Sequence, residues 1–481
     1  MKKHWFIISV LLVAFCLSAC RSETTEQDRT ENGSQAASRS EVKNQPENSS
    51  TNELQKEPEK ITVLCNSDSM VCRLVEQAAI DLRDKYDINI IRKWETEIDE
   101  TILSHKGTID LVVSEVTTWT AWTVDGSGIP SDRSWACYQD LTPFMDNELT
   151  FDENQYLPGT LEAGFLGGKQ LFFPLSITTN IILMSEEQAE KEEYQKLSEM
   201  PSLSDIYQLY QTATGSHLRA GDDSWISLLG GDFGSATSGM ELLLQSGDIQ
   251  IDWETGQVTA QEEGALQTLE FLKIMRRDWQ KENIPSFGDK EFPEVIQQSL
   301  GMIDNNFSGW YLNYRSEQYR TELEQEMNIM FLPKAESAEH YAVELSAFAG
   351  ILKESQNPEA AYEILRYISN MDASYWVDTS SRADFPARAD QAEMVLSTLS
   401  TVSETEEGEM KAPISEQAAE KLQLWLTGVD SVYLYPLFAE EQTKACMDAY
   451  YNGDINEEAC ISELCEILEE KVKAILANIA A

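Results

Sequence analysis

The hydrophobic and polar positions divide this chain into three parts. An apolar run, Trp5–Leu17, follows two lysines at the N-terminus. Across Arg21–Lys60 nearly every side chain is polar, and from Ile61 onward apolar residues recur with the spacings of strands and helices. We therefore expect an N-terminal leader, a polar segment and a folded body.

The folded body begins with alternating strand and helix patterns. Ile61–Leu64, Ile88–Ile91 and Ile109–Val113 are apolar runs of strand length. Between the first two runs, apolar residues recur at helical spacing over Val71–Leu82. This order predicts an α/β unit with a parallel sheet.

Polar segments follow the carboxyl ends of two of these strands. Asn66–Asp68 comes directly after the first strand, and Ser114–Trp122 follows the third. Ligands of open α/β sheets bind beyond the carboxyl ends of the strands, so we expect a binding site here. A site for a small molecule needs aromatic rings for its apolar faces and a few polar groups to orient it. Asp68, Glu115 and Trp119 are the candidates in these segments.

A later strand pattern is interrupted by a proline. Gly167–Leu175 is a turn followed by an apolar run that contains Pro174, and Asn180–Met184 is a second apolar run. Proline favours a sheet edge or a crossover over a central strand, so we expect the chain to cross between lobes here. Thr178, between the two runs, is a further polar candidate.

The C-terminal residues have the pattern of one long amphipathic helix. Asn456 and the two glutamates after it suit the N-terminus of a helix. The apolar residues that follow recur three and four positions apart, as expected for a face that packs on the core. They are Ile461, Leu464, Leu468, Val472, Ile475, Leu476 and Ile479.

Length and charge limit the architecture and the partners. About 420 residues follow Lys60, more than a single hydrophobic core usually serves, so two lobes are expected. The 481-residue chain has 36 Lys and Arg against 83 Asp and Glu, a net charge of −47. Such an acidic surface repels phosphate backbones and anionic lipids, which argues against nucleic acid as a partner and against peripheral docking on membranes.

The N-terminus has the features of a secretory signal. Two lysines, a short apolar run and small residues are typical of such signals, and the run is shorter than the ~20 residues of a membrane-spanning helix. Cys20 directly after Leu17-Ser18-Ala19 resembles the lipobox of bacterial lipoproteins, in which this thiol is acylated. We expect residues 1–19 to be removed, Cys20 to carry a lipid, and residues 20–59 to form a disordered tether. The alternative is an ordinary signal peptide with an incidental cysteine.

Six cysteines remain in the folded body, an even number that permits disulfides in an exported protein. Their spacing leaves the pairing open, with a bridge from Cys446 to Cys460 or Cys465 favoured and six buried free thiols as the alternative. No CxxC pattern or histidine cluster indicates a metal site. The six are Cys65, Cys72, Cys137, Cys446, Cys460 and Cys465.

No familiar catalytic pattern occurs in the sequence. A GxSxG elbow, an HExxH motif and a Walker A sequence are all absent. Acidic pairs such as Asp222 with Asp223 could imitate a glycosidase pair, but they arise by chance among 83 carboxylates. We expect a binding protein without a cofactor or a metal, not an enzyme.

Six short motifs occur in order along the chain, and they are Gly168–Leu175, Asp223–Gly231, Leu300–Trp310, Met330–Pro333, Asn357–Leu365 and Phe385–Arg388. Their order resembles the extracellular solute-binding proteins of family 1, the sugar-type receptors of ABC importers. The resemblance extends from Ile61 to the C-terminus. The chain departs from it where Cys65-Asn66-Ser67 replaces an aromatic residue and Glu344-Leu345-Ser346 replaces a glycine pair, both at the cleft of that family.

The resemblance implies an α/β two-lobe fold of the periplasmic-binding-protein type II, with an interlobe cleft and hinge crossovers. The first lobe would consist of residues 60–175 and 303–345, and the second of residues 176–302 and 346–481.

The resemblance also implies a function. Trp225, Trp310 and Tyr341 would be aromatic residues of the cleft. A lipid-anchored, monomeric receptor would close on a sugar or oligosaccharide by hinge motion and deliver it to an ABC permease. The alternatives are a surface lipoprotein of the same fold that acts as a sensor or interaction protein, and a secreted hydrolase.

The lipobox leads to a first prediction. Cys20→Ala should release the protein from the membrane fraction or leave the precursor uncleaved, because the variant lacks the thiol that is acylated. Fractionation of cells with detection of chain length measures this. A mature-length variant that still sediments with membranes would contradict the lipid anchor.

Overall fold

The computed structural model describes residues 57–481 with gaps. The gaps are 68, 106, 116–133, 180, 196–200, 207, 209–241, 245, 247, 280–301, 305–308, 332–341, 377–383, 402, 405–409, 412, 430 and 435–440. The predicted signal, Cys20 and the tether lie outside the described residues. None of the described helices is both long and apolar enough to cross a membrane.

A large mixed sheet contains the three N-terminal strands that the sequence predicts. Its strand order is β13-β6-β12-β3-β1-β2, and β16 pairs with β12 beyond the end of β3. β1 is parallel to β2 and β3, which confirms the α/β unit, while β12 is antiparallel to β3 and β6. The strands are β1 (Glu59–Asn66), β2 (Tyr86–Lys93), β3 (Leu111–Glu115), β6 (Phe173–Thr178), β12 (Ala342–Ile351), β13 (Phe385–Pro386) and β16 (Ser431–Tyr433).

A second sheet of three antiparallel strands has the order β10-β7-β11. β7 (Ile181–Ser185) follows β6 after residues 179–180, so the chain passes from one sheet to the other where the sequence predicts a crossover. β11 (Met327–Phe331) precedes β12 and gives the second passage, while β10 comprises Met302–Asp304. Pro174 lies near the start of β6, outside the two residues of β6, Ser176 and Ile177, that pair with β13.

Strands β11 and β12 lie near the predicted lobe boundaries. β11 lies within residues 303–345 of the predicted first lobe and pairs with β7, and β12 continues the large sheet to Ile351. The division into lobes stays a prediction.

The helices cover both sheets, and three short hairpins complete the described structure. Between β4 and β5, Gly167 and Gly168 both have positive φ, as a two-residue hairpin turn requires. The hairpins are β4 (Phe165–Leu166) with β5 (Lys169–Gln170), β8 (Ile249–Ile251) with β9 (Val258–Ala260), and β14 (Ser403–Glu404) with β15 (Met410–Lys411). The helices are α2 (Met70–Asp81), α3 (Glu95–Ser104), α5 (Thr142–Asn147), α6 (Glu186–Ala189), α7 (Glu192–Gln195), α10 (Glu262–Trp279), α12 (Gly309–Glu322), α13 (Pro358–Ser369), α14 (Ala389–Leu399), α15 (Glu416–Gly428), α16 (Glu441–Asn452) and α17 (Glu457–Ala480).

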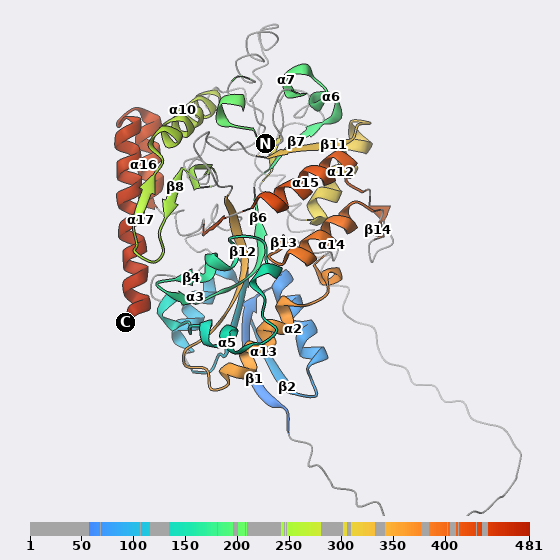
Figure 1. Cartoon of the computed structure of the whole chain (residues 1–481), viewed down its shortest axis with the longest axis vertical. Helices are drawn as coiled ribbons and strands as arrows, with labels where there is room; N and C mark the ends of the chain where they lie inside the picture. The colour runs from blue at the N-terminus through green and yellow to red at the C-terminus, as the bar shows by residue number, and fades with distance from the viewer. Residues whose placement is uncertain are drawn as a thin grey trace, which may run out of the picture. The chain divides into compact units, whose positions relative to one another are not determined.

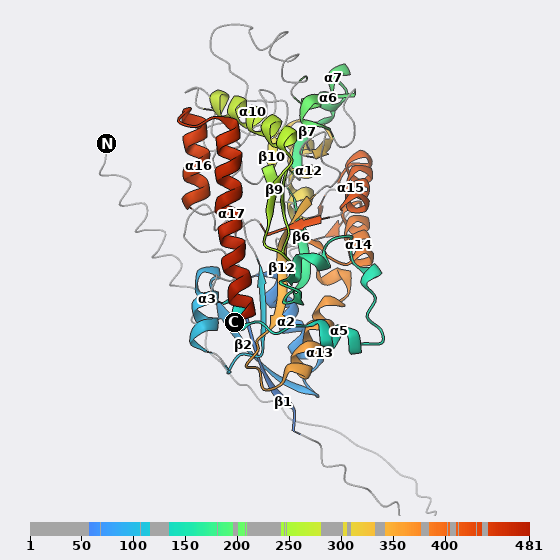
Figure 2. The same ribbon diagram turned by 60° about the vertical axis from the view of Figure 1, so that its left-hand side comes forward.

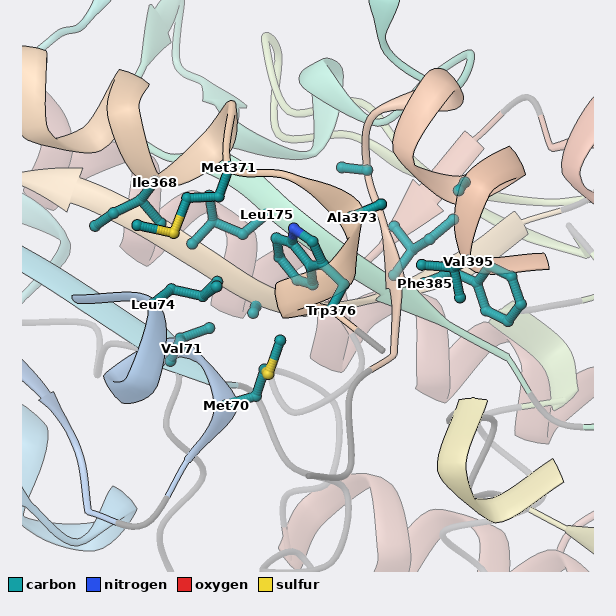
Figure 3. Close-up of a cluster of buried hydrophobic side chains, with 14 of the residues drawn as sticks. Met70, Val71, Leu74, Leu175, Ile368, Met371, Ala373, Trp376, Phe385 and Val395 are labelled. Carbon is teal, nitrogen blue, oxygen red and sulfur yellow. The ribbon is translucent and has the colours of Figure 1, made fainter. Parts of the chain in front are cut away.

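Apolar residues of the strands pack on both faces of the sheets. In β1, Ile61 and Val63 belong to one buried cluster and Leu64 to the other, and in β7 Ile181 and Ile182 separate in the same way. Strands buried on both faces have continuous apolar runs, which is the pattern seen in the sequence. In the first of these clusters, Trp376 lies among side chains of α2 and β13, including Met70 and Phe385 (Figure 3).

The C-terminal helix α17 has the predicted face and N-cap. Asn456 accepts a hydrogen bond from the Ala459 amide at 2.9 Å, and Leu464, Leu468 and Val472 are buried. α16 lies beside α17 in both views (Figures 1 and 2), and the sulfur atoms of Cys446 and Cys460 are 3.9 Å apart between them. The six cysteines of the body are free thiols in this structure.

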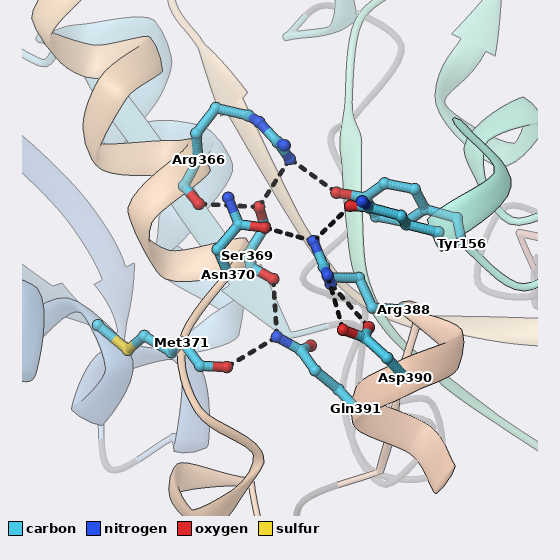
Figure 4. A network of polar contacts seen from close by, with 9 residues as sticks. Tyr156, Arg366, Ser369, Asn370, Met371, Arg388, Asp390 and Gln391 are labelled. Carbon is cyan, nitrogen blue, oxygen red and sulfur yellow. Dashed lines mark hydrogen bonds and ion pairs between the residues drawn. The ribbon is translucent and has the colours of Figure 1, made fainter. Parts of the chain in front are cut away.

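A buried arginine connects α13 to the loop before β4. Arg366 donates to Glu148 Oε2 at 2.9 Å and to the Tyr156 hydroxyl at 2.7 Å, and its guanidinium lies 5.2 Å from the centre of the Phe173 ring. Burial alone would raise the pKa of Glu148, but hydrogen bonds from Arg366 and Tyr362 lower it below its ordinary value. Arg388 continues the polar network toward Asp390 (Figure 4).

This arrangement predicts a large effect of Arg366→Met on stability. The variant leaves the partly buried Glu148 carboxylate without its cation, which should lower the free energy of unfolding by about 2–4 kcal/mol. Lys85→Met is the matched control, because the Lys85–Glu363 pair also joins α13 to another element but is exposed. The Lys85→Met variant should lower the free energy of unfolding by less than about 1 kcal/mol. Urea unfolding measures both, and equal losses would show that burial of the Arg366 pair is unimportant.

Candidate functional site

The carboxyl ends of β1 and β3 are fastened to the start of α2. The Glu115 amide donates to Asn66 Oδ1 at 2.7 Å, and Glu115 Oε1 accepts from the Met70 and Val71 amides at 2.7 and 3.3 Å. Ser69 caps the helix by accepting from the Cys72 amide at 3.1 Å. A carboxylate at a helix N-terminus satisfies amides that have no partner within the helix and suits the helix dipole. Glu115 therefore has a structural role at the predicted edge.

A second polar group lies beside the crossover from β6 to β7. Thr178 is the last residue of β6 and pairs with Glu344 of β12, and the β13 register brings Asp384 to its other side. The Thr178 and Glu344 side chains are buried, and Asp384 is half-buried. Ser176 and Ser346 share a 2.7 Å hydrogen bond between their hydroxyls in the same pair of strands. We call Thr178, Glu344, Ser346 and Asp384 the crossover cluster.

The crossover cluster favours a neutral carboxyl group. Burial raises the pKa of Asp384 to about 8, the negative charge of Glu115 contributes in the same direction, and the Ser346 and Thr178 hydroxyls act against both. The Thr178 hydroxyl influences the pKa of Asp384 without a regular hydrogen bond to it. This buried hydroxyl has no hydrogen-bond partner among the residues that the structure describes. At neutral pH the cluster can thus donate from a protonated carboxyl and from a hydroxyl.

The predicted ligand-binding residues fall into two groups. Glu115 and Thr178 are described, and both lie at the edge where the sequence predicts a site. The backbone of Trp310 is the second residue of α12, so the loop expected at this position is the first turn of a helix, which begins at Gly309. Its side chain lies outside the described residues, as do Asp68, Trp119, Trp225 and Tyr341.

Three members of the crossover cluster, Glu344, Ser346 and Asp384, were not among the predicted ligand-binding residues. Glu344 belongs to the segment that replaces the glycine pair of the resembled family. A charged residue in an otherwise apolar strand could have identified it as a functional candidate. Asp384 directly precedes the apolar pair Phe385–Pro386. Nothing local distinguishes it from the other acidic residues, because its place beside Thr178 depends on the register of β13.

A metal site would need several His, Cys, Asp or Glu side chains close together. Within the described parts of the chain, no three His, Cys, Asp or Glu side chains form a group that could hold a metal ion. The carboxyl groups of Glu115 and Asp384 influence each other electrostatically without forming such a group.

No protein-family model and no curated protein matches this sequence. Solved structures are similar in fold. The sugar-binding protein MalE from Xanthomonas citri has a TM-score of 0.60 and 12% identity, over 86% of this chain and 97% of that one. The GacH receptor of Streptomyces glaucescens, solved unliganded and with acarbose, has a TM-score of 0.55 and 14% identity, over 87% and 99%.

Further similar structures are also solute-binding proteins. One from Thermotoga lettingae, bound to α-D-tagatose, has a TM-score of 0.53 and 13% identity, over 86% of this chain and 100% of that one. Another, from Alicyclobacillus acidocaldarius, is described as an extracellular solute-binding protein of family 1, with a TM-score of 0.53 and 12% identity, over 87% and 99%. The similar structures are binding proteins and not enzymes, and this chain has the two-lobe α/β fold of the extracellular solute-binding proteins of family 1.

Proposed function

We propose that this protein is the lipid-anchored solute receptor of an ABC importer and that it binds a sugar or an oligosaccharide. The observation that carries the proposal is the crossover cluster, where a buried hydroxyl and a protonated carboxyl lie beside the passage from one sheet to the other. Because residues 179–180 join β6 to β7, rotation about this passage would bring the second sheet over the cluster. Delivery to a permease would follow reopening.

The cluster suits a neutral polyhydroxyl ligand. A sugar hydroxyl can accept a hydrogen bond from the protonated Asp384 carboxyl and donate one to Glu344, whereas a strongly anionic ligand would meet Glu115, Glu344 and a net charge of −47. Burial of a polar group is costly unless it is paired, and the ligand would supply a partner for the Thr178 hydroxyl, which has none among the described residues. Glu115 would act indirectly, since its carboxylate holds the first turn of α2.

Thermal unfolding with a ligand panel tests the proposal. A ligand that binds only the folded chain raises the melting temperature, by an amount that grows with ligand concentration. We expect a rise with at least one neutral mono- or oligosaccharide and none with amino acids, polyamines or divalent metals. A response to amino acids alone would contradict the sugar class. Product formation from a sugar would instead favour a secreted hydrolase, and no response at all would favour the sensor or interaction protein.

Asp384 gives the proposal a pH dependence. Its folded-state pKa of about 8 lies above the ordinary value of 3.8, so the carboxyl is protonated in the folded chain below pH 8. Sugar affinity should therefore be constant from pH 6 to 7 and fall as the pH rises through 8, when the donor is lost. Asp384→Asn keeps a donor at all pH values and should remove this fall. Titration calorimetry at pH 6, 7 and 9 measures it, with Asp390→Asn as the control from the adjoining helix. A fall that persists in Asp384→Asn would assign it to another group.

Trp310 provides a second variant. If its ring stacks on the apolar face of the sugar, Trp310→Ala should cost about 2–4 kcal/mol of binding free energy, as for a binding hot spot. The melting temperature without ligand should change little, since a wall that faces water leaves no sealed cavity. Affinity and melting temperature measured on the same variant decide the outcome. Loss of stability would make Trp310 a core residue, and unchanged affinity would place the site elsewhere.

A further inference from the structure

Two cysteine side chains meet where β1 ends and α2 begins. Cys65 is the last but one residue of β1, and Cys72 lies in the first turn of α2. The Cys65 thiol donates to the Cys72 sulfur, and the two sulfur atoms are 2.7 Å apart. Both side chains are buried. By comparison, the sulfur atoms of Cys446 and Cys460 are 3.9 Å apart, so the Cys65–Cys72 pair has the closer approach.

The surroundings of the two thiols differ in a way that assigns them separate roles. A hydrogen bond from Cys65 lowers the pKa of Cys72, burial acts against it, and the positive charge of Arg92 lowers it further. The hydrogen bond to Cys72 and burial raise the pKa of Cys65. Arg92 is the β2 partner of Cys65 in the strand ladder, and Cys72 is near the N-terminus of a helix, where thiolates are stabilised. In the folded chain Cys72 is therefore the more acidic of the two thiols, and Cys65 holds the shared proton.

We propose that Cys65 and Cys72 form a disulfide that fastens the first turn of α2 to the end of β1. The two sulfur atoms already adjoin each other, so the bond requires little movement of the backbone. The proposal does not depend on the ligand proposed above. In the cell it requires an oxidising compartment, which the predicted export signal would supply.

Thiol–disulfide exchange provides a balanced route to this bond. The thiolate of either cysteine attacks one sulfur of a disulfide oxidant such as oxidised glutathione, which forms a mixed disulfide and releases one thiolate. The other cysteine then loses its proton and attacks the protein sulfur of the mixed disulfide, which releases the second thiol. The protein loses two electrons and two protons, and the oxidant gains them as two thiols. Because both sulfur atoms are buried in the folded chain, the exchange takes place before α2 packs on the sheet.

The bond would lie next to the groups that organise the candidate edge. Asn66 and Ser69 fall inside the closed loop, and Asn66 holds the Glu115 amide while Ser69 caps α2. Closing this loop reduces the freedom of the unfolded chain and keeps these partners together. Reduction should therefore loosen the start of α2 first.

Thiol mapping on the full chain tests the proposal. The chain is reduced and unfolded, refolded in a buffer of oxidised and reduced glutathione, and unfolded again without reductant in the presence of a maleimide. Mass spectrometry of a tryptic digest should find Cys65 and Cys72 unlabelled in one peptide, Ile61–Arg73, with a mass two hydrogen atoms below that of its reduced form. Dithiothreitol should lower the melting temperature of the oxidised chain by about 2–6 °C.

Matched variants identify the pair that is responsible. Cys72→Ser should leave Cys65 labelled and remove the effect of dithiothreitol, while Cys446→Ser should leave the Cys65–Cys72 link intact. The mapping on the unsubstituted chain does not require any variant to fold. Labelling of both Cys65 and Cys72 after refolding would overturn the proposal, as would a glutathione adduct on Cys72 without a link or a link from either residue to another cysteine.

Discussion

The short passage from β6 to β7 holds the large sheet and the small sheet close together. Only residues 179–180 separate a strand of the large sheet from a strand of the small one, and β11 and β12 make the return passage. Because the connection is so short, the end of β6 and the start of β7 must stay close even if the two sheets rotate relative to each other. Thr178 and Glu344 are consequently held at the junction, where a change in the angle between the sheets would act on them directly.

Burying polar groups at this junction costs free energy of folding, and hydrogen bonds between neighbouring residues offset much of that cost. Buried hydroxyl and carboxyl groups destabilise a protein unless they are paired. Ser176 and Ser346 pair with each other, Glu115 is satisfied by the amides of α2, and Asp384 reduces its cost by taking up a proton. The Thr178 hydroxyl, among the described residues, keeps no hydrogen-bond partner. A site that leaves such a group for a ligand gains specificity for ligands with hydroxyl groups.

Features that depend on local periodicity were predictable from the sequence. β1, α2 and the buried face of α17 follow from apolar spacing within single segments, and the parallel pairing of β1 and β2 follows from their order along the chain with a helix between them. Asp384 was not predictable, because its role comes from the register of β13 with β6, and the lobe boundaries depend likewise on long-range pairing. Six thiols allow many pairings, so the contact of Cys65 with Cys72 needed the fold. Trp310 was assigned to a loop because Gly309 and the residues before it resemble a turn in sequence, whereas Gly309 is the first residue of α12.

We propose that a sugar binds at the crossover cluster, and a crystal structure of the chain with a sugar that raises its melting temperature tests this. We expect a sugar hydroxyl within hydrogen-bond distance of both Thr178 and Asp384, with the second sheet drawn over the ligand. A sugar bound in an ordered manner elsewhere, with both side chains unchanged, would contradict it.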